Sequence, residues 1–297
     1  MKKIGVDLGG TKIEIQLSND DVLDIISKER VPTEKEKGYE YILNKVCDLI
    51  KKYLELAGGE ATIGIGIPGS PSPKTSLVRN ANTESLNGQN FAGDIEKVLG
   101  QKVYIANDAN CLALSECIVG AGKGLDPVVG IILGTGVGSG VIINGKILVG
   151  ANGNGGEFGH STIVQEGIPC WCGKNGCVEK YLAGPGFENS YFEISGTRKT
   201  SAEIYADIQN EERYALEAKR VYLKHFKVAI GNLVQIIDPE AIILGGGVSN
   251  MDFLYDEGKK LIDTFISDPY NEFQLLKNKL GDSSGIFGAA LLPEMHG

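Results

Sequence analysis

The sequence lacks any excess of basic residues. Its 297 residues contain 29 Lys and Arg against 38 Asp and Glu, which gives a formal net charge of −9 at pH 7. A nucleic-acid partner is therefore not expected, because phosphate binding needs a basic surface. No apolar run approaches the ~20 residues that a membrane-spanning helix needs. No signal peptide is expected either, since Met1-Lys2-Lys3 leads directly into an apolar strand, and we expect a cytoplasmic protein.

Histidine, cysteine and tryptophan are scarce, with 3, 6 and 1 residues respectively. Six cysteines in a chain of this length fit a reducing compartment rather than a disulfide framework. One of the three histidines and three of the six cysteines nevertheless fall in one short segment: His160, Cys170, Cys172 and Cys177. These ligand types, with glycines that let the loop fold back, suit a closed tetrahedral Zn²⁺ site. No further Cys or His lies nearby, so the predicted zinc is structural.

Two alternatives to zinc exist. Cys170 and Cys172 would form a strained or redox-active pair, or the three cysteines would be unrelated buried thiols. The Cys-x-Cys spacing is poor for a disulfide, and the nearby His160 favours metal. Glu157 and Glu179 flank the cluster, so a metal that fixes this loop would also position both carboxylates for a ligand.

Two stretches repeat a pattern of an apolar strand, a glycine-rich turn and a second apolar strand. They span residues 3–17 and 128–145. The repetition suggests two related halves of the chain. Each glycine-rich loop would let a phosphate approach the backbone closely, and Asp7 at the end of the first strand would hold Mg²⁺ through water. A plain hairpin is the alternative for each loop taken alone.

Further candidate residues follow predicted strands. Asp108 lies where a strand ends and a helix begins, a place where ligands bind in α/β folds, although an N-capping aspartate is equally typical there. The polar segment 70–90 contains Asn82 and is either a binding loop or an ordinary surface excursion. A strand near residue 244 ends in three glycines, which suits a base or ribose packed on the backbone or simply a tight turn. Helices are predicted over residues 38–56 and 211–237.

Together these motifs resemble the ROK family of sugar kinases, over nearly the whole chain and in the family's order. The motifs are Asp7-Leu-Gly-Gly-Thr-Lys12, Gly64-Ile-Gly-Ile-Pro-Gly69, Asn107-Asp108-Ala-Asn110, Gly134-Thr-Gly136, Gly155-Gly-Glu157-Phe-Gly-His160 and Cys170-x-Cys172-Gly-x-x-Gly-Cys177-x-Glu179. The resemblance implies an α/β fold of the actin-like ATPase superfamily, with two ribonuclease-H-like domains around a central cleft. The N-terminal domain would span residues 1–120, joined by the last helix at about 286–297. The C-terminal domain would span residues 121–285 and carry the zinc loop 160–177.

The resemblance also implies roles for individual residues. Asp108 would be the general base that takes the proton of a sugar hydroxyl as it attacks the γ-phosphate of ATP. The sugar-binding residues would be Gly69, Asn82, Asn107, Asp108, Glu157, His160 and Glu179. His160 would place one ring nitrogen on zinc and the other on the sugar. Asp7 would organise Mg²⁺. Nucleotide-binding residues would be Gly9, Gly10, Thr11, Lys12, Gly134, Thr135 and Gly136 around the phosphates, and Gly246 and Gly247 at the adenosine.

Within the family, the chain is most similar to bacterial fructokinases of the manno(fructo)kinase type. The expected activity is ATP-dependent phosphorylation of the 6-hydroxyl of a hexose, with D-fructose first. N-acetylglucosamine kinase and glucose or mannose kinase are the alternatives, because the segment between His160 and Cys170 is short and the region after Glu188 is not diagnostic. A sugar-responsive repressor is not expected, since such proteins carry a helix-turn-helix ahead of the Asp7 motif. The family analogy suggests a homodimer.

Overall fold

The computed structural model describes residues 1–266, 268 and 270–296, and its first half contains a five-stranded sheet in the order β3-β2-β1-β4-β7. The strands are β1 (Lys3–Leu8), β2 (Lys12–Ser18), β3 (Ile25–Pro32), β4 (Thr62–Ile67) and β7 (Tyr104–Asn107). The first three strands form an antiparallel meander. Strand β4 pairs in parallel with β1, and β7 pairs in parallel with β4.

The part of the chain from residue 128 onward, called the second half below, builds a sheet of the same design, in the order β10-β9-β8-β11-β12. Its strands are β8 (Val128–Leu133), β9 (Val137–Ile143), β10 (Lys146–Ile147), β11 (Ala241–Gly245) and β12 (Gln274–Lys277). Again an antiparallel meander is followed by two parallel strands. The predicted duplication of the strand–glycine–strand pattern is therefore confirmed at the level of whole sheets.

The inner strands of both sheets, among them β1, β4, β8 and β11, are buried because they are apolar along much of their length. In β4, for example, Ile63, Ile65 and Ile67 are fully buried. Parallel strands covered on both faces show such continuous apolar composition. Each sheet consequently has its own core cluster, and a third cluster lies between the two halves.

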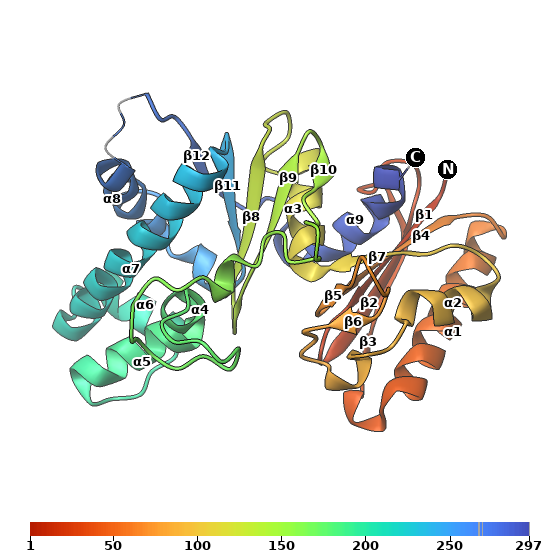
Figure 1. The fold of residues 1–297 in the computed structure, drawn as a ribbon, viewed down its shortest axis with the longest axis horizontal. Coiled ribbons are helices and arrows are strands. Elements are labelled where there is room, and N and C mark those ends of the chain that lie inside the picture. The colour runs from red at the N-terminus through yellow and green to blue at the C-terminus, as the bar shows by residue number, and fades with distance from the viewer. Residues whose placement is uncertain (267, 269, 297) are drawn as a thin grey trace.

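The helices cover the outer faces of the two sheets and fill the space between them (Figure 1). They are α1 (Tyr39–Ala57), α2 (Phe91–Leu99), α3 (Asp108–Ile118), α4 (Glu179–Leu182), α5 (Gly184–Ser195), α6 (Ser201–Gln209), α7 (Arg213–Ile237), α8 (Glu257–Ile266) and α9 (Ser284–Leu291). The helices predicted over residues 38–56 and 211–237 are confirmed to within two residues as α1 and α7. The predicted end of the last helix at residue 297 lies outside the described residues.

Two helices, α3 and α9, pack against each other in the middle of the molecule (Figure 1). Helix α3 lies on β8 and β9, whereas α9 returns from the end of the chain to lie on β1 and β4. Glycine permits this close packing: a Cβ at Gly64 would collide with the carbonyl of Ala289, and one at Gly288 with the carbonyl of Cys111. The last helix thus packs on the first sheet, while the division of the chain into domains at residue 120 stays a prediction.

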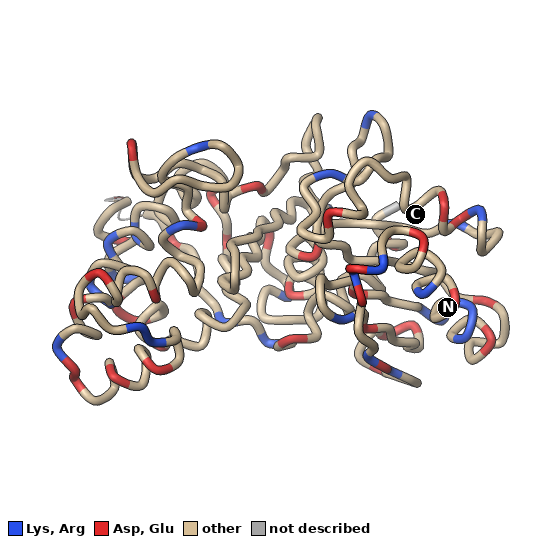
Figure 2. The backbone as a smooth tube through the Cα atoms, turned by 90° about the horizontal axis from the view of Figure 1, so that it is seen from below, with Lys and Arg blue, Asp and Glu red and all other residues tan. Residues whose placement is uncertain are grey.

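The polar segment 70–90 is less irregular than its sequence predicts. It contains a small antiparallel pair, β5 (Ser70–Pro71) and β6 (Val78–Arg79), and a short 3₁₀ turn over Glu84–Leu86. Acidic and basic residues are interspersed over the whole molecule (Figure 2). Among the described residues, no helix combines the length and apolar character needed to cross a membrane.

Candidate functional site

A pocket of about 550 Å³ opens between the two halves of the chain. All of the residues predicted to bind sugar line it, although they come from distant parts of the sequence: Gly69, Asn82, Asn107, Asp108, Glu157, His160 and Glu179. The second glycine-rich loop contributes Gly134, Thr135 and Gly136 to the same wall. The fold therefore brings the predicted sugar residues and one predicted phosphate loop together in one cavity.

Asp108 is the first residue of α3, directly after β7. The N-cap is Asn107, whose Oδ1 accepts from the Ala109 N–H at 2.9 Å; the same N–H also donates to Asp108 Oδ1 at 2.8 Å. Asn107 Nδ2 donates to the carbonyl of Gly69 at 3.3 Å, which ties β7 to the adjacent loop. Burial raises the pKa of the Asp108 carboxyl, and the charge of Glu157 raises it further, while the hydrogen bonds from Ala109 and Asn107 oppose the rise.

Asp7 does not line this pocket, but its carboxylate lies close enough to Asp108 to interact electrostatically. Burial raises the pKa of Asp7 to about 6, and the charges of Asp108 and Glu14 add to the effect. The Asp7 carboxylate also lies against Gly285 at the start of α9, where a Cβ would lie 3.3 Å from one of its oxygens and 3.6 Å from the other. Two buried carboxylates that repel each other suit a divalent cation, which would favour both ionised forms.

The four scarce residues of the zinc prediction converge in the structure. One ligand atom from each of His160, Cys170, Cys172 and Cys177 lies within 4.8 Å of all the others. Cys172 Sγ lies 3.6 Å from Cys177 Sγ, and Cys170 Sγ lies 3.7 Å from His160 Nδ1. Zinc bound at about 2.3 Å to sulfur in a tetrahedron separates two sulfurs by about 3.8 Å. The donor set and its spacing therefore fit Zn²⁺.

Glu179 is held from two sides. Its Oε1 accepts from the indole N–H of Trp171 at 2.9 Å, and its Oε2 accepts from the Val137 N–H at 3.2 Å. The carboxylate comes so close to the glycine-rich loop that a Cβ at Gly136 would lie 2.6 Å from Oε2. Trp171 also packs edge-on against the imidazole of His160, with ring centroids 4.8 Å apart.

Sequence reasoning missed Trp171, Lys180 and Asn80 as lining residues of this pocket. A signal existed for Trp171, because the only tryptophan of the chain stands between two predicted zinc ligands. Lys180 directly follows Glu179, but a lysine in a surface helix usually only faces solvent. Asn80 has a positive φ of 56°, which no sequence pattern indicated.

The remaining predicted nucleotide residues lie outside the lining of this pocket. The residues between β1 and β2 form a tight turn in which the Gly9 N–H donates to the carbonyl of Lys12 at 2.9 Å. Gly246 follows β11 with a φ of 83°, and a Cβ there would lie 2.5 Å from the carbonyl oxygen of Leu133. Gly246 is therefore next to the start of the second glycine-rich loop. A Cβ at Gly247 would meet no atom within 4 Å.

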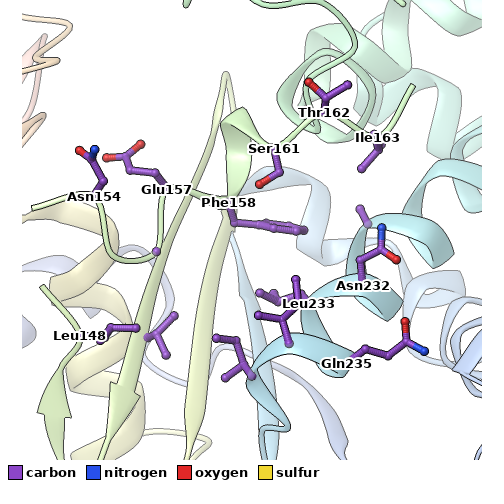
Figure 3. A pocket seen from close by; sticks show the side chains of 15 residues that line it. Leu148, Asn154, Glu157, Phe158, Ser161, Thr162, Ile163, Asn232, Leu233 and Gln235 are labelled. Atoms are coloured by element: carbon purple, nitrogen blue, oxygen red, sulfur yellow. The ribbon is translucent and has the colours of Figure 1, made fainter. Parts of the chain in front are cut away.

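A second groove, of about 510 Å³, lies next to the pocket, and Gly156 and Glu157 line both spaces. It is mainly apolar, and Leu148, Phe158 and Leu233 line it (Figure 3). Figure 3 shows the ring of Phe158 pointing toward Leu233, whereas the adjacent Glu157 extends to the other side of the backbone. The segment after residue 155 thus separates an apolar groove from the polar pocket.

Comparison with protein families gives a match to the model of the ROK family over residues 3–295. Among curated proteins, the N-acetyl-D-glucosamine kinase of Yersinia enterocolitica is 37% identical over 298 residues, which cover 97% of this chain and 98% of the relative. The N-acetyl-D-glucosamine kinase of Pasteurella multocida is 36% identical over 301 residues, covering 98% of each chain.

Solved structures give the same picture of the fold. The ROK hexokinase from Thermus thermophilus superposes with a TM-score of 0.88 at 30% identity, covering 98% of this chain and 97% of that one. A ROK family glucokinase from Streptomyces griseus, in complex with glucose and AMPPNP, superposes with a TM-score of 0.80 at 29% identity, covering 99% and 100%. The predicted ROK resemblance and the α/β fold of the actin-like ATPase superfamily are thereby confirmed.

Proposed function

Because the chain belongs to the ROK family and is a sugar kinase, we propose that it transfers the γ-phosphoryl group of ATP to the 6-hydroxyl of N-acetyl-D-glucosamine. The names of the similar curated proteins carry the choice of sugar, since these relatives share 35–37% identity with nearly the whole chain. Our first expectation, D-fructose, has no such support. Glucose is a rival substrate, since one structural neighbour at 29% identity is a glucokinase.

The proposed reaction centres on Asp108. Its carboxylate accepts the proton of the sugar 6-hydroxyl while that oxygen forms a bond to the γ-phosphorus of ATP. The bond between the γ-phosphorus and the bridging oxygen breaks, and ADP leaves with the electron pair. General-base catalysis of this kind contributes about 10²–10⁴-fold, and positioning and charge neutralisation supply the rest. The raised pKa of Asp108 makes its carboxylate a better proton acceptor than an exposed aspartate.

The sugar would be held by polar groups around the same cavity. We assign hydrogen bonds with its hydroxyls to Asn82, Asn107, Glu157, His160 and Glu179, with Gly69 leaving room for the ring. Zn²⁺ would be held by Cys170, Cys172, Cys177 and His160 Nδ1, the ring nitrogen nearest Cys170 Sγ. Ligation at Nδ1 leaves His160 Nε2 as a committed donor to the sugar.

The nucleotide would lie across the two glycine-rich loops. We assign the phosphates to Gly9, Gly10, Thr11, Lys12, Gly134, Thr135 and Gly136, and the adenosine to Gly246 and Gly247. Asp7 would hold Mg²⁺, which neutralises charge on the transferred phosphoryl group. Positive charge at Lys12 would assist, since phosphoryl transfer is governed by positioning and electrostatics.

A coupled assay with ATP and Mg²⁺ across N-acetyl-D-glucosamine, glucose, mannose and fructose tests the proposal. We expect the highest kcat/KM with N-acetyl-D-glucosamine. A higher kcat/KM with fructose would restore our first expectation and overturn the proposal. The homodimer also stays a prediction, which light scattering of the purified protein at several concentrations would check.

A further inference from the structure

A cavity of about 830 Å³, different from the apolar groove of Figure 3, adjoins the proposed sugar pocket and is called the second cavity below. Asn80, Asn82 and Trp171 line both, so these three residues form the boundary between the two spaces. Asp108 and the second glycine-rich loop line only the first. The volume of the second cavity falls in the range of about 300–1,000 Å³ that is typical of small-molecule sites.

The boundary between the cavities has the chemistry of an amide-binding wall. The carboxamides of Asn80 and Asn82 make no side-chain hydrogen bond to any residue that the structure describes, so each can both donate and accept. Trp171 is 64% exposed, although its indole N–H is fixed on Glu179. A ligand that carries an amide group next to an apolar chain would hydrogen-bond to the two asparagine carboxamides and pack its chain on the ring of Trp171.

Beyond the boundary the cavity is partly apolar. Leu77 is 36% exposed there, next to the largely buried Val78 and Ala81. The charged group of Arg79, a further lining residue, is engaged with the carbonyl of Asn152. An uncharged chain with methylene groups therefore fits this space better than a second phosphate or carboxylate, since Glu84 also faces it.

The shape of a hexose directs one substituent toward this wall. In a pyranose ring, carbon 2 lies across the ring from carbon 5, which carries the 6-hydroxymethyl group. A sugar that presents its 6-hydroxyl to Asp108 consequently points its carbon-2 substituent away from Asp108. In N-acetyl-D-glucosamine that substituent is an amide.

We propose that the second cavity is an acyl subsite, which takes the N-acyl group on carbon 2 and accepts chains longer than acetyl, such as propanoyl and butanoyl. This inference rests on the proposed function, because it assumes an N-acylated amino sugar in the pocket. Trp171, Asn80 and Asn82 would contact the amide, and the chain would extend over Leu77. A closed acetyl pocket would exclude such chains, because a tightly packed site discriminates against one extra methylene by about 10–200-fold.

The test is kcat/KM for N-acetyl-, N-propanoyl-, N-butanoyl- and N-hexanoylglucosamine with ATP. We expect the N-butanoyl sugar to stay within about 10-fold of the N-acetyl sugar. A loss of about 100-fold or more already at propanoyl would overturn the subsite. If N-acetylglucosamine itself is not phosphorylated, the proposed function fails; if only the longer chains are refused, the subsite alone fails.

A variant that narrows the second cavity at a residue outside its boundary with the sugar pocket makes the test more specific. Thr75 is exposed and lines only the second cavity, so Thr75→Phe narrows it without touching the sugar pocket. We expect about a 10-fold loss of kcat/KM for the N-butanoyl sugar and little change for the N-acetyl sugar. Thr75→Ser is the matched control and should change neither. Equal losses for both sugars with Thr75→Phe, or none for either, would place the acyl chain elsewhere and overturn the proposal.

Discussion

Trp171 and Glu179 are joined by a hydrogen bond of 2.9 Å from the indole N–H to the carboxylate, in the wall of the proposed sugar pocket. Trp171 stands between two cysteines of the predicted zinc site, and Glu179 opens α4. The loop that carries the predicted zinc ligands thus contacts the carboxylate of Glu179 through the indole of Trp171. The second glycine-rich loop contacts the same carboxylate through the Val137 N–H. The conformation of the metal-binding loop therefore determines where Glu179, a proposed sugar-binding residue, lies.

Trp171→Phe should therefore raise the KM for sugar about 10-fold, since hydrogen bonds to charged groups contribute about 1.5–3 kcal/mol. Phenylalanine keeps a ring against His160 but removes the indole N–H. Steady-state kinetics should show kcat nearly unchanged, because the reacting groups stay in place. Trp171→Ala, which also removes the ring contact, should raise KM further. An unchanged KM in Trp171→Phe would contradict the positioning of Glu179 by the indole.

Asp108→Asn should reduce turnover by at least about 10²-fold, because the variant lacks the proton acceptor. Sugar binding should persist, since asparagine keeps the size and a hydrogen-bonding oxygen. Trp171 is the only tryptophan of the chain and lines the pocket, so its fluorescence during a sugar titration measures binding directly. Asp48→Asn, at a side chain that is 77% exposed on α1, is the control. Turnover near the wild-type level would remove Asp108 from the mechanism.

Asp7 makes the protein without Mg²⁺ less stable as the pH rises. Its pKa is about 6 in the fold against an ordinary value of 3.8, so the folded state binds more protons between these values. Stability consequently falls as the pH rises through this window and levels off above it. Asp7→Asn, which cannot ionise, should melt at a higher temperature than wild type at about pH 8 and at a similar temperature at about pH 4.

Thermal denaturation by circular dichroism, without Mg²⁺ or nucleotide, measures this difference. Adding Mg²⁺ should raise the melting temperature of the wild type and leave Asp7→Asn unaffected. A variant that melts below wild type at about pH 8 would show that the carboxylate is stabilising without the cation.

Cys172→Ala should lose the bound metal, since a structural zinc site requires all four ligands. Metal analysis of the purified protein should give zinc in the wild type and much less in the variant. The KM for sugar should rise as well, because His160 belongs to the same cluster. Cys117→Ala, at a cysteine outside the cluster, should keep its zinc. Full zinc occupancy in Cys172→Ala would contradict the ligand assignment.

Gly247→Ala should separate nucleotide binding from stability. A Cβ at this position meets no protein atom within 4 Å, so the melting temperature should not change. The KM for ATP should rise if the adenosine packs here, as proposed. The comparison is Gly64→Ala, in which the new Cβ would collide with the carbonyl of Ala289. That variant should lose about 1–3 kcal/mol of stability. An unchanged KM for ATP in Gly247→Ala would place the adenosine elsewhere.

The sequence alone determined the local elements and the chemical identity of the site. Apolar periodicity located α1 and α7 because burial imposes a fixed spacing on the apolar residues of a helix. The repeated strand–glycine–strand pattern indicated two related halves. The resemblance named the pocket residues, and the scarcity of cysteine and histidine exposed the metal cluster. The sequence did not decide which sugar is the substrate: the family resemblance favoured D-fructose, whereas the similar curated proteins are N-acetyl-D-glucosamine kinases.

Only the tertiary structure decided which of these local features meet. It set Trp171 between His160 and Glu179 at the edge of a second cavity. It also made Asn107, rather than Asp108, the cap of α3. The reason is physical: contacts such as that of Gly64 with Ala289 depend on how whole elements pack. Periodicity within one element specifies which face is buried but not what covers it.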